Sequence, residues 1–144
     1  MIAVDTNLLV YAHRRDATFH AAAKRLIATL SEATASWAIP WPCIHEFYSA
    51  VTNVRAYKPA SSAVQAVAQV DAWFGSPSLV VMHESAQHWE TLRGLLGAAQ
   101  VSGGLVHDAR IAAMCLDHGI TELWSADRDF NRFPRLKVRN PLIG

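Results

Sequence analysis

The fold is decided by Ile2-Ala3-Val4-Asp5-Thr6-Asn7, which directly follows the first methionine. Three apolar residues in succession predict a short buried strand of a parallel sheet. Asp5 then lies at the carboxyl end of that strand, where open α/β sheets bind their ligands. Apolar residues recur at helical spacing over residues 8–14, so we expect a helix to follow the strand directly.

The rest of the chain alternates between predicted strands and predicted helices. Short apolar runs predict further strands over residues 37–39, 79–82, 122–124 and 136–138. Helical spacing predicts further helices over residues 21–30, 42–54, 61–74, 85–96 and 107–118. This alternation is typical of an α/β protein, and we expect one three-layer α/β/α domain with a mostly parallel central sheet over residues 1–144.

Short polar side chains indicate where several of these helices begin. Asp16 and Thr18 are the candidate N-caps of the second helix. The pair Ser61-Ser62 is expected to open the fourth helix, and Ser85 to cap the fifth. Pro40 is expected to end the second strand, because proline has no backbone N–H to donate.

Composition places the chain among packed globular proteins, because 51% of its residues are hydrophobic and 17% are charged. The formal charge of +1 does not mark a binder of bulk polyanions, although an acidic pocket can mask a basic rim in that sum. Cys43 and Cys115 are too few for a disulfide framework and lack zinc-site spacing, so we expect two small buried residues. With no signal-peptide pattern and no run of ~20 apolar residues, we expect a cytoplasmic location and no membrane partner.

Carboxylates fall at several places where βα units deliver residues to one edge of a sheet. Asp5 follows the first strand, and Glu46 lies about one turn into the helix after residues 37–39. Asp108 begins a helix after a pair of glycines, and Asp127, with its neighbour Asp129, follows the strand over residues 122–124. Each acid alone has an ordinary explanation as a cap, a turn residue or a solvated side chain. Their common edge favours a shared site.

A shared site of this kind implies a metal. Converging carboxylates repel one another and shift each other's pKa unless a cation neutralises them. Oxygen ligands favour a hard cation, Mg²⁺ or Mn²⁺, over zinc. Such a site is typical of phosphoryl chemistry, in which the metal acidifies a bound water and a second metal can stabilise the leaving oxygen.

Four motifs in this order resemble one known family. They are Asp5-Thr6-Asn7, His45-Glu46-Phe47, His107-Asp108-Ala109 and Ser125-Ala126-Asp127-Arg128-Asp129-Phe130. Together they resemble the PIN-domain ribonucleases and, more narrowly, the VapC toxins of bacterial toxin–antitoxin pairs. The likeness runs from Val4 to the closing Asn140-Pro141-Leu142.

The resemblance implies roles for particular residues. Asp5, Glu46, Asp108 and Asp127 would form the catalytic, metal-binding cluster. Asp129 would be an accessory or alternative fourth acid. The resemblance also implies that Ser125 orients the cluster and that Asn7 is the polar residue expected after the first acid. Ser125 and Asn7 would therefore be accessory residues of the site, like Asp129.

The resemblance also implies an activity and partners. A PIN-like domain of this type cuts single-stranded RNA with metal-activated water and leaves a 5′-phosphate and a 3′-hydroxyl. The implied cofactor is Mg²⁺ or Mn²⁺. The implied partners are RNA, a small cognate antitoxin that blocks the site, and a second copy of the chain in a homodimer.

Basic residues near the acids are candidate phosphate contacts. Arg128 follows Asp127 and Arg132 follows Asp129, in a segment that also contains Arg135, Lys137 and Arg139. Arg14, with Arg15, follows the first acid and could extend the same rim. A solvated surface face is the alternative interpretation of these positions.

Other function classes fit the sequence less well. A phosphatase of the haloacid dehalogenase type needs a second acid two residues after the first, and that position is Asn7. His45-Glu46 and His83-Glu84 begin like a zinc-protease motif, but neither has the required second histidine. A non-catalytic binding module with the same fold is the third alternative, and the presence of all four acids argues against it.

Overall fold

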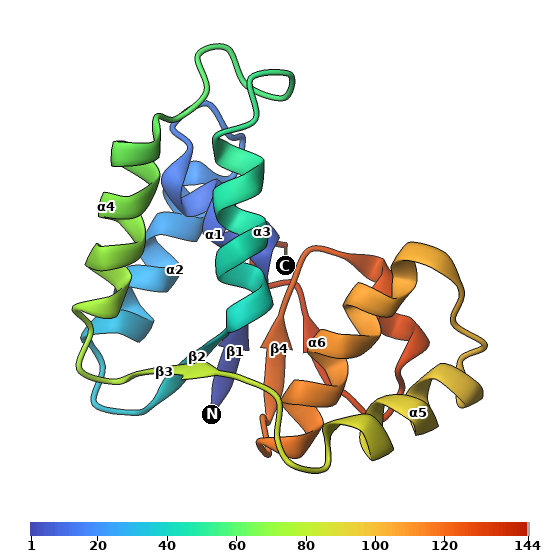
Figure 1. Ribbon diagram of the computed structural model, residues 1–144. Helices are drawn as coiled ribbons and strands as arrows, with labels where there is room; N and C mark the ends of the chain where they lie inside the picture. The colour runs from blue at the N-terminus through green and yellow to red at the C-terminus, as the bar shows by residue number, and fades with distance from the viewer. Residues whose placement is uncertain (144) are drawn as a thin grey trace.

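A five-stranded sheet forms the centre of the computed structural model, which describes residues 1–143 (Figure 1). Its strands are β1 (Ile2–Val4), β2 (Trp37–Pro40), β3 (Leu79–Met82), β4 (Glu122–Trp124) and β5 (Val138–Arg139). The spatial order is β3-β2-β1-β4-β5, and every neighbouring pair is parallel. The predicted parallel sheet is therefore confirmed, with β1 at its middle.

Six helices flank the sheet in the described residues. They are α1 (Thr6–His13), α2 (His20–Glu32), α3 (Trp41–Val51), α4 (Ala63–Phe74), α5 (His88–Ala98) and α6 (Val106–Asp117). Helices α1 to α4 gather on one side of β1 and β4, and α5 and α6 on the other (Figure 1). This arrangement confirms the predicted α/β/α class. Within residues 1–143, no helix has the length and apolarity needed to cross a bilayer.

The core is built where helices cover both faces of the middle strands. Ala3, Val4 and Leu123 are fully buried, as expected for a parallel sheet covered on both faces. Trp37 is fully buried too, and its indole N–H donates a hydrogen bond of 3.1 Å to Ser76 Oγ, so its polar atom is satisfied.

Cys43 and Cys115 are free and buried, as the sequence predicted. Both lie on helices that cover the sheet, α3 and α6. The thiols therefore form no disulfide, and they contribute to the core as small side chains.

The start of α2 differs from the prediction. Neither Asp16 nor Thr18 caps it, because the helix begins at His20 with Phe19 as its N-cap residue. The carboxylate of Asp16 instead accepts two hydrogen bonds from the guanidinium of Arg14, at 2.9 and 2.6 Å. A charge-assisted bidentate ion pair is stronger than a single cap hydrogen bond, which explains why Asp16 binds Arg14 and does not cap α2.

The start of α4 agrees with the prediction. Ser62 is the N-cap, and its hydroxyl accepts the backbone N–H of Gln65 at 3.1 Å. Gln65 Oε1 in turn accepts the backbone N–H of Ser62, which completes a capping box. Ser85 does not act as a cap in this way: α5 begins after Gln87, and the Ser85 hydroxyl donates to Asp117 at 2.8 Å.

Several element boundaries differ from the prediction by a few residues. Pro40 is the last residue of β2 and not the first beyond it. Helix α3 ends at Val51, so Val54 lies outside it and is 71% exposed. The last strand covers Val138–Arg139, while Leu136, expected in that strand, is buried in the core before it. A buried side chain at the entry to a strand has the same apolar pattern as the strand itself.

Candidate metal centre

Asp5 occupies the turn between β1 and α1. It is the N-cap residue of α1, but its carboxylate makes no cap hydrogen bond. Its backbone N–H donates to the carbonyl of Trp124 at 3.0 Å, which fixes the end of β1 beside the end of β4. Only 4% of Asp5 is exposed. The carboxylate is therefore held inside the carboxyl edge of the sheet and does not serve the helix.

Three side chains donate hydrogen bonds to this carboxylate. Ser125 Oγ donates to Oδ2 at 2.7 Å, and Asn7 Nδ2 donates to the same atom at 3.3 Å. Cys43 Sγ donates to Oδ1 at 3.5 Å. Burial raises the pKa of Asp5, and the hydrogen bonds from Ser125 and Cys43 act in the opposite direction. The donors therefore stabilise a charge that burial disfavours.

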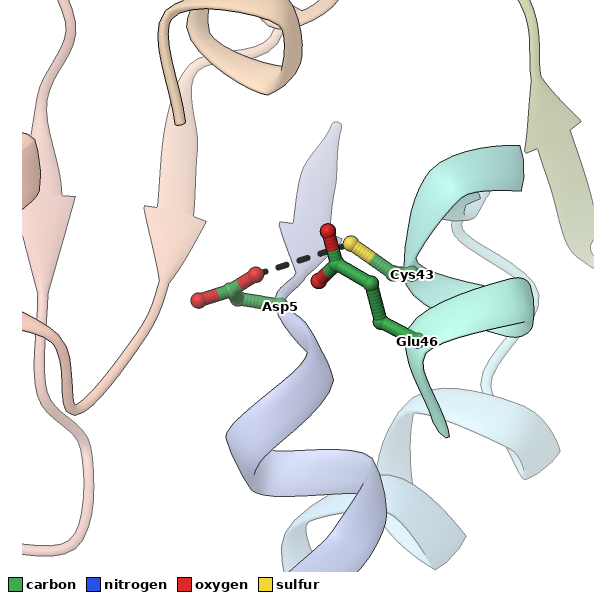
Figure 2. Close-up of side chains that lie close together, drawn as sticks. All are labelled: Asp5, Cys43 and Glu46. Carbon is green, nitrogen blue, oxygen red and sulfur yellow. Dashed lines mark hydrogen bonds between the residues drawn. The ribbon is translucent and has the colours of Figure 1, made fainter. Parts of the chain in front are cut away.

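Glu46 reaches the same place from α3. Figure 2 shows the side chains of Cys43 and Glu46 extending from that helix toward Asp5. One ligand atom from each of these three residues lies within 4.8 Å of the others. The hydroxyl of Thr6 donates to Glu46 Oε2 at 2.6 Å, so α1 fixes the direction of a carboxylate that belongs to α3.

Asp108, Asp127 and Asp129 form a second, adjoining group. Their carboxylates also offer atoms within 4.8 Å of one another. Asp108 lies in the first turn of α6. Asp127 is the N-cap of the short 3-10 helix η2 (Arg128–Arg132), and its Oδ1 accepts the backbone N–H of Asp129 at 2.9 Å.

Ser125 and Asn7 connect the two groups. The hydroxyl of Ser125 donates to Asp5 and accepts the backbone N–H of Asp127 at 3.0 Å. Asn7 Oδ1 accepts the backbone N–H of Ala126 at 3.1 Å, and its Nδ2 donates to Ser125 Oγ at 3.3 Å. Two polar side chains thus join the end of β1 to the loop that carries Asp127.

The electrostatics of Asp108 show that the two groups act on each other. Its pKa is raised from 3.8 to about 6, first by burial and then by the negative charges of Asp127, Asp5, Asp129 and Glu46. None of these five acids takes part in the ion pairs found within residues 1–143. The acids predicted from the sequence therefore come together at one edge, and no cation of the described part of the chain forms an ion pair with them.

Comparison with known proteins identifies the family. The model of the PIN domain matches residues 2–136. This chain belongs to the PIN-domain family. VapC ribonuclease Mb2897 of Mycobacterium bovis is 36% identical over 144 residues, which is 100% of this chain and 97% of the relative. The resemblance drawn from the four motifs is confirmed.

Solved structures of PIN domains share the fold. VapBC2 from Rickettsia felis, bound to a DNA fragment from its promoter, matches with a TM-score of 0.68 and 20% identity over 96% of this chain and 98% of that chain. Mycobacterium tuberculosis VapC20, described as a Sarcin-Ricin loop cleaving toxin, matches with a TM-score of 0.67 and 21% identity over 91% and 93% of the two chains.

The donor set of this PIN domain fits a hard divalent cation. Five carboxylates supply oxygen atoms, which Mg²⁺ and Mn²⁺ prefer. Cys43 adds a soft sulfur atom to the group of Asp5 and Glu46, but burial and the negative charge of Asp5 raise the pKa of its thiol well above the ordinary value. Cys43 therefore stays protonated and donates to Asp5, whereas a metal ligand would have to be a thiolate.

Sequence reasoning missed two residues of this site. The sequence predicts Cys43 only as a buried core residue and indicates no role for Thr6. Cys43 lies three residues before Glu46, a spacing that places both on one face of a helix. Thr6 directly follows Asp5. The helical spacing was therefore a usable signal for Cys43, whereas nothing local connects Thr6 to a residue 40 positions away.

The basic residues of the predicted rim lie in different surroundings. Arg128 and Arg132 are exposed on η2, directly after Asp127. Arg14 lies at the far end of α1, where it pairs with Asp16, and its side chain is only 11% exposed. Its guanidinium carbon lies 4.3 Å from the centre of the Tyr57 ring. Arg14 thus belongs to a different surface from the two arginines of η2.

The burial of Asp108 and the negative charges around it predict a pH-dependent stability of the metal-free PIN domain. Because the folded pKa of Asp108 is about 6 and the unfolded value is 3.8, the folded protein holds more protons between these pH values. Its stability therefore falls as pH rises through this window. In EDTA near pH 7, Asp108→Asn should be more stable than wild type by roughly 1 kcal/mol, after discounting for solvent screening.

Urea unfolding near pH 7 and near pH 4 measures this difference, which should disappear at the lower pH. Asp71→Asn, at an exposed acid of α4, is the control and should show no comparable gain. An Asp108→Asn protein no more stable than wild type near pH 7 would show that burial and the neighbouring acids do not destabilise the charged form of Asp108.

Metal binding at a shared site should raise the melting temperature. At a Mg²⁺ or Mn²⁺ concentration tenfold above Kd, binding contributes about 1.4 kcal/mol, which is a rise of about 4 °C for a domain of this size. Asp5→Asn should abolish the rise because it removes the most buried carboxylate of the cluster. Differential scanning fluorimetry with and without metal measures it, with Asp71→Asn as the control that keeps the rise. An equal rise in Asp5→Asn would place the bound metal elsewhere.

Proposed function

We propose that this PIN domain is a metal-dependent endoribonuclease and the toxin of a toxin–antitoxin pair. The observation that carries the proposal is the convergence of five carboxylates at one edge of the sheet without a protein cation among residues 1–143. Membership of the PIN-domain family and 36% identity to a protein named as a VapC ribonuclease support the choice of RNA as substrate.

Asp5, Glu46, Asp108 and Asp127 would hold Mg²⁺ or Mn²⁺. When bound, such an ion acidifies a water molecule and neutralises charge on the phosphodiester. The protein supplies the directions of its ligands: Thr6 orients Glu46, and Ser125 orients Asp5 and the loop of Asp127. Outer hydrogen bonds of this kind orient metal ligands and tune their basicity.

Substrate contacts beside the acids would come from η2. Arg128 and Arg132 are exposed and directly follow Asp127, so their guanidinium groups can bind phosphates on either side of the scissile bond. Asp129 lies between them in the sequence and is exposed, which suits an accessory acid. Phosphate contacts hold an RNA strand without reading its bases.

The alternative functions have less support. The two groups of acids, whose charges all act on Asp108, favour a catalytic domain over a non-catalytic PIN-fold module. A phosphatase of another α/β family would not account for the match to the PIN domain over residues 2–136.

The partners inferred from the sequence follow from the same proposal. The likeness to VapBC2 supports a cognate antitoxin. A homodimer is supported by an exposed apolar face on α3 and α4, where Tyr48 is 39% exposed and Val67 is 50% exposed. This face surrounds a hollow of about 370 Å³. The cytoplasmic location stays a prediction.

Metal-dependent cleavage of RNA is the direct test. Wild-type protein should cut an RNA pool in Mg²⁺ or Mn²⁺, and EDTA should stop it. Asp108→Asn should lower the rate by more than about 100-fold, because it removes a ligand and not only an outer partner. Gel analysis of end-labelled RNA measures both rates. Equal cleavage by wild type and Asp108→Asn would mean a contaminating nuclease and would overturn the proposal.

The fourth ligand can be identified by comparing two neighbouring variants. Asp127 is partly buried and held by Ser125, whereas Asp129 is exposed. Asp127→Asn keeps an amide oxygen to accept the N–H of Asp129, so η2 should stay formed. We expect Asp127→Asn to lower the RNA cleavage rate at least tenfold more than Asp129→Asn does, because loss of a group that supports a metal site typically lowers activity on the order of 10- to 100-fold. The opposite order in cleavage rates and Mn²⁺ titrations would assign the fourth ligand to Asp129.

A further inference from the structure

A second hollow lies at the opposite end of α1 from the acids. It has a volume of about 900 Å³ and lies between the end of α1, the start of α2, residues 58–61 and one side of α4 from Gln65 to Ala72. Helix α1 has eight residues, so the hollow begins about 12 Å along the helix from Asp5. We call it the α1–α4 hollow.

The α1–α4 hollow is strongly basic. Its lining includes four cationic residues and one acid, which leaves a net of three positive charges when histidines are neutral. The acid, Asp16, is already paired with Arg14. The other three cations, Arg15, Lys24 and Lys58, are exposed and form no ion pair within residues 1–143. This concentration is invisible in the chain's total charge of +1.

The floor of the hollow is held in place by hydrogen bonds. His13 Nδ1 lies 3.1 Å from Gln69 Oε1, and His13 Nε2 lies 2.8 Å from the hydroxyl of Ser61. Because an amide oxygen only accepts, a neutral His13 carries its proton on Nδ1 and accepts from Ser61. Ser61 is buried, and its Oγ also accepts from Arg14 Nη1 at 3.4 Å. The polar floor is thus ordered before any ligand arrives.

The hollow offers neutral donors as well as charges. Gln65 uses its Oε1 in the capping box of α4, and within residues 1–143 its amide nitrogen has no hydrogen-bond partner. The apolar part of the lining consists of alanines and Pro59, with no aromatic or large aliphatic side chain. Protein partners are usually anchored by such large side chains, whereas phosphate groups need only cations and N–H donors.

We propose that the α1–α4 hollow binds phosphates of single-stranded RNA several nucleotides from the scissile bond. The inference rests on the proposed ribonuclease function and extends it to a distal part of the substrate. A strand with its scissile phosphate at the acids would follow α1 to reach Lys24 and Lys58. Contacts of this kind would add affinity and orientation but no base specificity.

Charge neutralisation with a matched control tests the proposal. Lys24→Gln with Lys58→Gln removes two cations of the hollow. Arg25→Gln with Arg55→Gln removes two exposed cations beside them, on α2 and on the loop before α4, that do not line it. Both double variants are made in the Asp108→Asn protein so that the probe, a labelled 12-nucleotide RNA of mixed sequence, stays intact.

Fluorescence anisotropy over a range of salt concentrations measures the affinity. We expect the Lys24/Lys58 variant to bind the RNA about tenfold more weakly at low salt. The slope of log binding constant against log salt concentration (the salt slope) should also be smaller in magnitude by about 1.4, because each phosphate contact contributes about 0.7. The Arg25/Arg55 variant should stay within about twofold of its parent. Melting temperatures of the two double variants should agree, since all four residues are exposed.

Other outcomes would overturn the proposal in distinguishable ways. Equal RNA affinity and salt slope in both double variants would remove the distal subsite while leaving the ribonuclease function intact. A labelled oligoglutamate peptide that binds through Lys24 and Lys58, with RNA binding unaffected, would make the hollow a site for an acidic protein segment. If wild type neither binds nor cleaves RNA, the proposed function fails and the subsite fails with it.

Discussion

Parallel pairing of β1 with β2 on one side and with β4 on the other brings Asp5, Glu46 and Asp127 to one edge of the sheet. Parallel neighbours end at the same edge, so the segments that leave β1, β2 and β4 all begin there. The hydrogen bond from the Asp5 N–H to the Trp124 carbonyl extends this register by one residue into the site. Had β4 run antiparallel to β1, Asp127 would lie at the opposite edge from Asp5.

The same arrangement concentrates negative charge that the fold must tolerate. Burial raises the pKa of Asp5, and the neighbouring acids help to raise the pKa of Asp108 to about 6. Neutral hydrogen-bond donors reduce the free-energy cost of a buried negative charge on Asp5, because Ser125, Asn7 and Cys43 all donate to its carboxylate. Neutral groups orient the carboxylates without cancelling their charge, so the attraction for a divalent cation is retained. An arginine in their place would stabilise the metal-free fold and occupy the site.

Charge of opposite sign collects at the two ends of α1. Asp5 and its neighbours lie before the first turn, while Arg14, Arg15 and the two lysines of the α1–α4 hollow lie beyond the last turn. The two sets nearly cancel in the total of +1, which is why the overall charge did not indicate a polyanion binder. For the proposed phosphodiester substrate, the arrangement would separate the reacting phosphate at the acids from phosphates that only need holding.

The sequence by itself determined the fold class and the identity of the clustered acids. Apolar runs such as Ile2–Val4 specify buried strands, and acids just beyond such runs must lie at the carboxyl edge of a parallel sheet. This reasoning is local, because it uses only residues adjacent in the chain. It succeeded for Asp5 and Asp127 for that reason.

Only the tertiary structure decided which side chains share hydrogen bonds. Thr6 binds Glu46 across 40 positions, and Ser125 binds Asp5 across 120. Arg14 illustrates the same limit: its place in the chain indicated a rim beside the acids, but α1 carries it to the other end of the helix, against Asp16 and Ser61. Short-range patterns specify secondary structure, whereas contacts between distant residues depend on how the helices pack on the sheet.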